Sequence, residues 1–330
     1  MNRRPRQPAG RAAPSGGDDT AGSPDSRPHP HRGPICAVIN PAAGRGRGAR
    51  MWPDIRGPLV AAGLDIREVI VGRMGDALDA AERASRDGAE IVVAVGGDGT
   101  LNEALNGLMR IPPALRPALA FVPGGTGNIF ARALGLPTRP AGLIELLLGG
   151  TRRRLDVGRV NERYYATVAG VGFDGELVGR AAQWPRLLGS KPMHVVAFLS
   201  TLIVYRSPSA RLTIDDRRRD VTLTFLAAAN TDWYGGGLHI APGARPDDGA
   251  LDVVYTHALT RTGTIAVALG AFSGRHIEHP GVTRVLAREV TVDADVPVGI
   301  HADGEWLGRA PATFRIVPQA LDVMTPGRAD

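Results

Sequence analysis

Residues 92–103 read Val-Val-Ala-Val-Gly-Gly-Asp-Gly-Thr-Leu-Asn-Glu. The β-branched run is typical of a buried strand, and the glycines that follow allow a tight turn into a helix. Glycine lets a phosphate approach the backbone, and free N–H groups at a helix N-terminus favour an anion. The stretch therefore predicts a phosphate-binding turn between a strand and a helix. By itself it is equally typical of an ordinary turn in which Asp98 caps the helix.

A second stretch has the same character. Residues 120–128 read Ala-Phe-Val-Pro-Gly-Gly-Thr-Gly-Asn, again a strand that runs into glycines before a helix. Two such loops at the ends of successive strands are expected to face each other across a crevice at one edge of the sheet. Thr126 and Asn128 can donate hydrogen bonds there, or cap the next helix. The pair of loops favours phosphate binding over an ordinary turn.

The flanking sequence predicts an α/β domain. Strands are expected at 35–39, 65–71, 91–95 and 119–122, with a glycine-rich loop at 40–48 and helices near 75–87 and 101–109. Such alternation of apolar strands and helices indicates a parallel sheet that is covered on both faces. The α/β domain is expected over 34–155.

After about residue 154 the pattern changes to short β-branched runs separated by Gly, Asp and Pro, which favours a mainly antiparallel domain over 156–330. The runs are 165–168, 212–214, 221–228, 251–255, 290–292 and 312–316. Helices are expected at 176–183, 193–205 and 262–272. Residues 1–33, rich in Pro, Gly and Arg, predict a disordered tail without the apolar core of a signal peptide.

Composition narrows the classes of function. A formal charge of +6 and a pI near 10.2 favour an anionic partner. The single cysteine, Cys36, excludes an intramolecular disulfide and is expected in a buried strand. The longest apolar stretch, near 193–205, is too short to span a bilayer, so a cytoplasmic protein that is soluble or peripheral at the inner face of the membrane is expected.

Several enzyme classes lose support from missing motifs. Lys191 is the only lysine and fits neither a Walker A loop nor a protein kinase strand. The α/β domain expected over 34–155 contains no Gly-x-Gly-x-x-Gly fingerprint, and a Gly-x-Ser-x-Gly elbow is absent as well. His276 and His279 lack the surroundings of a zinc site and are expected in solvent.

From residue 34 onward the chain resembles the diacylglycerol kinase catalytic-domain family, which includes sphingosine and ceramide kinases and bacterial soluble lipid kinases. The motifs that carry the resemblance are Asn40-Pro41 with Gly44, residues 96–100, residues 123–128, residues 246–252 (Pro-Asp-Asp-Gly-Ala-Leu-Asp) and Asp303-Gly304-Glu305. The resemblance implies a doubly wound N-terminal domain like those of NAD kinase and phosphofructokinase. It also implies a C-terminal antiparallel β-sandwich, with the active site in the cleft between the two.

Carried onto this chain, the resemblance implies ATP and Mg²⁺ as cofactors. The implied nucleotide-binding residues are Val71, Gly97, Asp98, Gly99, Thr100, Leu101, Asn102, Glu103 and Thr126. Glu305 falls where the family places its general base. Independently, residues 303–305 form a turn with two close carboxylates, which suits base catalysis or metal positioning, although without the resemblance a plain Asp-Gly turn is the preferred interpretation. Many relatives have Asp after the second glycine loop, where this chain has Ile129.

The resemblance also implies a magnesium ion in the second domain. It would be held by the Asp248 side chain and by the backbone carbonyls of Arg245 and Ala250. Hard cations prefer such oxygen ligands, and a largely hydrated Mg²⁺ needs only one or two carboxylates. A solvated acidic turn is the alternative. A further Mg²⁺ is expected to accompany ATP, with Asp98 as the nearest protein group.

The acceptor is expected to be a lipid hydroxyl, diacylglycerol-like or sphingoid- and ceramide-like. Residues 184–205 are a candidate for transient membrane contact, and a helix packed on the sheet is the alternative. A homodimer is left open, and nucleic-acid binding is not expected because few aromatic residues accompany the arginines. Two alternative functions stay open. One is an NAD kinase or other soluble-metabolite kinase, and the other is an inactive nucleotide-binding membrane sensor.

Overall fold

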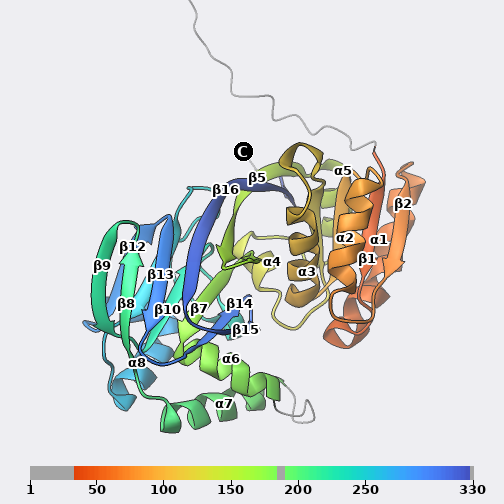
Figure 1. The fold of residues 1–330 in the computed structure, drawn as a ribbon. Coiled ribbons are helices and arrows are strands. Elements are labelled where there is room, and N and C mark those ends of the chain that lie inside the picture. Colours follow the sequence, from red (N-terminus) through yellow and green to blue (C-terminus); the bar gives the residue numbers. More distant parts are fainter. Residues whose placement is uncertain (1–32, 184–189, 328–330) are drawn as a thin grey trace, which may run out of the picture.

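The computed structural model describes residues 33–183 and 190–327. The predicted disordered tail, apart from residue 33, lies outside the described residues, and so does the 184–189 part of the candidate membrane segment. Helices and strands fill two regions that lie side by side (Figure 1). None of the described helices has the length and apolar character needed to cross a membrane.

The first region is a parallel sheet in the strand order β2-β1-β3-β4. Its strands are β1 (Ile35–Ile39), β2 (Ile66–Ile70), β3 (Ile91–Gly96) and β4 (Ala118–Pro123). Its helices are α1 (Arg47–Ala61), α2 (Asp76–Arg86), α3 (Asp98–Met109), α4 (Ile129–Ala133) and α5 (Pro140–Gly149), with short 3-10 turns η1 (Ala43–Gly46) and η2 (Pro113–Leu115).

Both faces of this parallel sheet are covered, as the sequence predicts. Successive strand residues point to opposite faces, so Cys36 and Val38 pack with α2 and α3, while Ile35 and Ala37 pack with α1 and α5. The apolar runs of β1, β3 and β4 are buried along their whole length. This double burial makes the strands continuous apolar runs rather than alternating ones.

The second region is mainly antiparallel. Its first elements are β5 (Thr151–Val160), β6 (Arg163–Tyr165), β7 (Val168–Gly172), α6 (Phe173–Gln183), α7 (Ser190–Val204), β8 (Ser209–Ile214), β9 (Arg217–Thr222) and β10 (Phe225–Ala229). They are followed by η4 (Gly235–Gly237), β11 (Leu251–Thr256), α8 (Arg261–Ala271), η5 (Arg275–Glu278), β12 (Val282–Ala287), β13 (Glu289–Ala294), β14 (Gly299–Ala302), β15 (Glu305–Arg309) and β16 (Ala312–Thr325).

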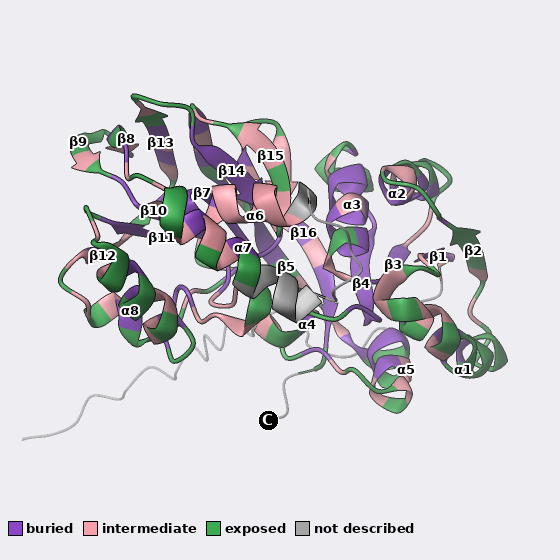
Figure 2. Cartoon of the chain, turned by 90° about the horizontal axis from the view of Figure 1, so that it is seen from below, coloured by how far each residue is buried: buried purple, intermediate pink, exposed green. Residues whose placement is uncertain are grey.

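Two sheets form the predicted sandwich. The strand order of the smaller sheet is β12-β11-β10-β7-β14-β15, and the larger sheet continues from β4 through β16, β13 and β8 to β9. Buried side chains from both sheets share one core, which includes Tyr165, Tyr255 and Phe314. Figure 2 shows the strands largely buried and α6 mainly intermediate, while α7 and α8 carry exposed residues on one side.

The long strands β5 and β16 join the two regions. Near its start, β16 pairs antiparallel with β13, and near its end Val323 pairs parallel with Leu119 of β4. β5 follows β16 antiparallel over most of its length. The predicted domain boundary near residue 155 falls within β5, so one continuous sheet extends from the α/β region into the sandwich.

Three local expectations are wrong. The run 165–168 is a connection rather than a strand, because β6 ends at Tyr165 and β7 begins at Val168. The run 221–228 is divided between β9 and β10. His276 is buried rather than solvated: its Nε2 forms a 2.9 Å hydrogen bond with the Ile240 carbonyl, and burial lowers the pKa of its imidazole.

Candidate active site

Three glycine loops meet where β1, β3 and β4 end. A Cβ atom on Gly125 would lie 2.6 Å from the Gly97 Cα, and one on Gly48 would lie 3.2 Å from the Gly124 Cα. The Gly124 amide donates to the Gly96 carbonyl at 2.6 Å. The loops after β3 and β4 are therefore in direct backbone contact, whereas the sequence predicts a crevice between them. Only glycine permits this approach.

Asp98 links the two loops through its side chain. Its Oδ1 accepts a hydrogen bond of 3.3 Å from the Phe130 amide at the start of α4. Burial raises the pKa of the Asp98 carboxyl, the α4 amides oppose that effect, and Asp303 adds to it. Asp98 thus caps α4, the helix after the second loop, and not α3, to which it belongs. This contact stabilises the conformations of both loops together.

The other predicted nucleotide-binding residues divide into an exposed and a buried set. Gly99 and Thr126 are exposed on the loops, and Gly97 is half-buried. Val71 and Leu101, in contrast, are buried in the core of the α2–α3 face. The backbone of the two glycines and the side chain of Thr126 are open to a ligand, whereas the side chains of the second set support the loops from behind.

Two further members of that predicted set hold neighbouring segments. Thr100 is buried, and its hydroxyl accepts a 3.1 Å hydrogen bond from the Asn40 amide group. The Glu103 carboxylate accepts a 3.2 Å hydrogen bond from the Ala77 amide in the first turn of α2. Both side chains join the loop and α3 to adjacent elements of the α/β region.

Asn102 connects α3 to the sandwich. Its side chain is buried, and its Nδ2 donates to Asp303 Oδ2 at 2.8 Å and to the Tyr164 carbonyl at 3.2 Å. Asp303 also accepts from the Ala166 amide at 2.7 Å, and from the Thr167 amide and hydroxyl at 2.9 and 2.6 Å. This one carboxylate therefore binds both regions of the chain, and its lone pairs are occupied by structural donors.

Glu305 lies at the start of β15, two residues after Asp303. Its Oε2 accepts a 2.9 Å hydrogen bond from Arg163, which also donates to Asn102 Oδ1 at 2.9 Å. Burial raises the pKa of the Glu305 carboxyl, Arg163 opposes this, and the charges of Glu103 and Asp303 add to it. The Glu305 side chain keeps 31% of its surface exposed. Of the two carboxylates in this turn, Glu305 is the one that can accept a proton from a ligand.

The acidic turn at 245–252 is stabilised by arginines. Asp247 bonds Arg153 at 2.6 Å and Arg245 at 3.3 Å; burial would raise the pKa of its carboxyl, but these cations lower it. Asp248 is exposed, and its Oδ1 accepts a 3.1 Å hydrogen bond from the Ala250 amide. No cluster of three or more His, Cys, Asp or Glu side chains suited to a metal occurs in the described part of the chain.

Two polar groupings near the junction of the regions are absent from the sequence-based predictions. His301, fully buried on β14, places Nε2 3.0 Å from both the Tyr234 hydroxyl and Asp174 Oδ2. The Arg132 guanidinium of α4 lies 3.4 Å above the Trp233 ring. The sequence offers no local signal for the first, because the two partners of His301 lie 67 and 127 residues away in the chain.

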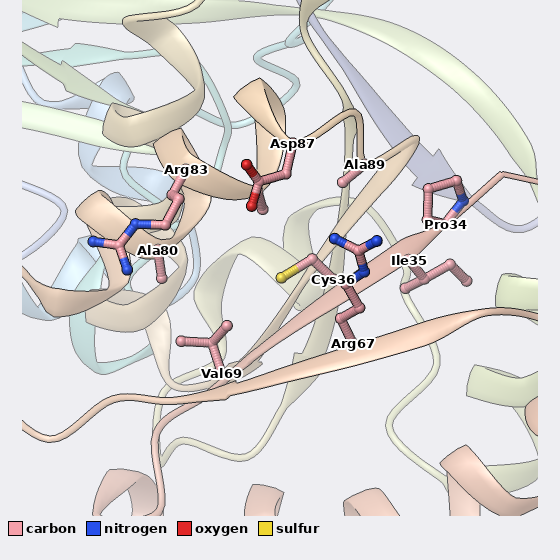
Figure 3. Close-up of a pocket in the computed structure, with 10 residues that line it drawn as sticks. Pro34, Ile35, Cys36, Arg67, Val69, Ala80, Arg83, Asp87 and Ala89 are labelled. Carbon is pink, nitrogen blue, oxygen red and sulfur yellow. The ribbon is translucent and has the colours of Figure 1, made fainter.

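A small pocket of about 80 Å³ lies away from these loops (Figure 3). It is lined where β1 begins and α2 ends, by Cys36, Arg67 and Asp87 among others. Burial raises the pKa of the Cys36 thiol, and Cys36 lies in the buried strand that the sequence predicts. The pocket therefore belongs to the opposite end of the parallel sheet from the glycine loops.

A glycine-loop α/β domain joined to a β-sandwich through a carboxylate turn defines a phosphotransferase of the kinase type. Residues 34–160 match the family model described as diacylglycerol kinase catalytic domain, and residues 167–325 match the one described as YegS C-terminal NAD kinase beta sandwich-like domain. The chain belongs to the diacylglycerol kinase family, as the sequence motifs predict.

Relatives of this family cover almost the whole chain. A diacylglycerol kinase of Mycobacterium tuberculosis is 32% identical over 305 residues, which are 89% of this chain and 96% of the relative. One of Staphylococcus epidermidis is 30% identical over 297 residues, 88% and 91% of the two chains. A crystal structure of a diacylglycerol kinase from Bacillus anthracis superposes with a TM-score of 0.67 at 20% identity, covering 88% of this chain and 96% of that one. At this low identity, the similarity to the Bacillus anthracis structure shows a shared fold.

Replacing Asp303 is expected to destabilise the whole protein. Asp303→Ala leaves the Asn102 and Thr167 side-chain donors and three backbone amides without this acceptor, at a cost of roughly 2–4 kcal/mol in the free energy of unfolding. Urea unfolding measures this cost. Asp216→Ala, at an exposed turn between β8 and β9, is the matched control and should stay within about 0.5 kcal/mol of the wild type. Equal stability of the two variants would contradict the central role of Asp303.

Proposed function

We propose that this protein is an ATP-dependent lipid kinase, which transfers the γ-phosphate of ATP to the hydroxyl of a diacylglycerol-like or a sphingoid- or ceramide-like lipid. The observation that carries the proposal is Glu305: a partly exposed carboxylate held by Arg163 and attached, through Asp303 and Asn102, to the helix that begins at the phosphate loop. Base and phosphate loop are therefore parts of one hydrogen-bonded unit. The names of the relatives support a lipid acceptor.

The nucleotide would lie against the loops after β3 and β4. Main-chain amides of Gly97 and Gly99 and the side chain of Thr126 would contact its phosphates. Asp98 would lie near the magnesium ion that accompanies ATP and neutralises charge on the phosphates. Thr100, Leu101 and Val71 would act by holding the loop conformation, because their side chains are buried.

The chemistry at Glu305 follows from its protonation. When ionised, Glu305 accepts the proton of the acceptor hydroxyl as the oxygen attacks the γ-phosphorus. The bond from that phosphorus to the β–γ bridging oxygen breaks, and ADP leaves with the electron pair. Arg163 holds the carboxylate in position and favours its ionised form, while burial brings the pKa closer to neutrality, where a base is most effective.

A structural Mg²⁺ at the acidic turn is the second part of the proposal. One oxygen of Asp248 with the carbonyls of Arg245 and Ala250 would hold it. Among the described residues these two carbonyls accept none of the turn and loop hydrogen bonds, so they are available to a cation. One carboxylate and two carbonyls fit a hydrated Mg²⁺.

Two other functions are separated by the acceptor. An NAD kinase would phosphorylate NAD and no lipid, and an inactive sensor would bind ATP without turnover. The presence of Glu305, with its raised pKa and its arginine partner, favours an active kinase over a sensor.

Ile129 stands where many relatives have an aspartate, and it is buried at the start of α4. Asp98 therefore faces the backbone amides of α4 and not a second carboxylate.

The first experiment measures transfer of labelled phosphate from Mg-ATP to a panel of lipids in mixed micelles, with NAD as the soluble control. We expect a labelled lipid, and a loss of turnover of about a hundredfold or more in Glu305→Gln. The conservative change should leave ATP binding and the folded structure intact. Unchanged turnover in Glu305→Gln would exclude it as the base, and labelling of NAD alone would establish the metabolite kinase instead.

Arg163→Gln is expected to shift the pH profile. The base is active when ionised, so activity falls as pH drops through the pKa of Glu305. Loss of the guanidinium removes the main opponent of the burial effect, raises that pKa further and moves the acidic limb of kcat/KM to higher pH. Arg159→Gln, which removes an exposed pair with Glu162, is the control and should leave the limb in place. If the acidic limb stays in place in both variants, Arg163 does not influence the pKa of the base.

Removal of Asp248 is expected to abolish stabilisation by Mg²⁺ in the absence of nucleotide. Binding to the folded state alone adds about 1.4 kcal/mol at tenfold excess over Kd, so Mg²⁺ should raise the Tm of the wild type by a few degrees. Asp248→Asn should lose this increase, while Asp216→Asn should retain it. Thermal unfolding with Mg²⁺ or chelator measures the difference, and an equal increase in both variants would place the ion elsewhere.

A further inference from the structure

Helix α7 carries apolar side chains on its outer as well as its inner face. Ala197 and Thr201, four residues apart, are buried toward the protein. On the other side Leu199 is 51% exposed and Ile203 is 68% exposed. A helix on a protein surface normally turns charged or polar residues toward water. Over residues 196–204, the part of α7 whose side chains the structure describes, the outer face therefore lacks the polar side that contact with water alone would favour.

Helix α8 has the same character. Its inner residues Thr264, Val267 and Ala271 are buried, with spacings of three and four. Its outer residues are exposed and follow the same spacing: Ile265, Leu269 at 65% and Phe272 at 59%. Two independent helices thus present apolar side chains to the outside, and an exposed patch of this kind marks an interaction site.

The end of α7 lies beside the start of α8. The Arg261 guanidinium in the first turn of α8 donates a 2.9 Å hydrogen bond to the Ile203 carbonyl near the end of α7. Figures 1 and 2 place both helices along the same edge of the sandwich. We call the combined face the α7–α8 surface; its exposed apolar residues are Val196, Leu199, Ile203, Val204, Ile265, Leu269 and Phe272.

The two chain segments that contain these helices carry charged residues of one sign only. No Asp or Glu occurs between Glu176 and Asp215, or between Asp252 and Glu278, the two segments that contain the helices. Arg206 and Arg261 are exposed at the rim. A second copy of the chain would bring the same cations against these, which disfavours self-association. Apolar residues with basic neighbours instead match a bilayer that carries anionic headgroups.

We propose that the α7–α8 surface is the face on which this protein docks to an anionic phospholipid bilayer. The inference rests on the proposed lipid kinase function, since docking would bring the protein to its acceptor. The proposal also agrees with the short connection between the α7–α8 surface and Glu305. α7 contacts α6, and α6 is fastened to β14 and β15 by Glu176, which bonds the Gly299 amide at 2.9 Å and Arg309 at 2.7 Å. One helix layer therefore separates the surface from the strand that begins with Glu305.

The test is sedimentation with vesicles of phosphatidylcholine containing phosphatidylglycerol, without ATP. The double variant Ile203→Glu/Leu269→Glu places two carboxylates on the surface and should weaken vesicle binding about a hundredfold, roughly tenfold for each lost apolar contact. Leu115→Glu is the matched control: Leu115 is 70% exposed but lies in η2 of the α/β region, and its substitution should leave binding unchanged. Urea unfolding confirms that both variants fold.

Kinase assays separate this inference from the proposed function. If both hold, the double variant phosphorylates a monomeric short-chain acceptor at the wild-type rate and loses activity only on vesicles. If the protein phosphorylates no lipid, vesicle binding still tests the surface by itself. The inference is overturned if the double variant binds vesicles like the wild type. It is also overturned if binding does not depend on phosphatidylglycerol, or if the substitutions change only the oligomeric state seen by size exclusion.

Discussion

The structure depends on the hydrogen bonds that converge on Asp303. Its carboxylate accepts hydrogen bonds from the buried Asn102 side chain of the α/β region and from backbone amides in the connection between β6 and β7 of the sandwich. Because Asn102 lies in the first turns of the helix that starts at the phosphate loop, the position of Glu305 relative to that loop is determined by short polar contacts. Apolar packing, which is tolerant of small displacements, could not define this geometry as closely.

Arginine chemistry supports the same arrangement. Arg163 reaches Glu305 and Asn102 with one planar group, and Arg132 stacks on Trp233 across the junction of the two regions. Both contacts use the fork and the flat face of guanidinium, which an ammonium group does not offer. In a chain with a single lysine, these arginine contacts help to set the orientation of the two regions relative to each other.

The sequence was sufficient for the fold because its signals are local. Buried strands such as 91–95 show as continuous apolar runs, and glycine loops show as strand ends. The apolar run at the β6–β7 connection predicts a strand, but a carboxylate 136 residues away in the chain imposes a turn there. The sequence around His276 predicts a solvated side chain because it does not reveal the partner carbonyl on Ile240. For the site, the loops and Glu305 were predictable from motifs, whereas Arg163, His301 and the path of β16 depend on contacts between distant segments.

The pairing of β16 with β4 has a consequence for how the chain reaches its folded state. The α/β region precedes β16 in the chain, yet β16 supplies the strand beside β4. During synthesis the edge of β4 stays open until residues 312–325 leave the ribosome, and an open edge is prone to pairing with other chains. The sheet of the α/β region therefore gains this neighbouring strand only after the intervening sandwich sequence has been made.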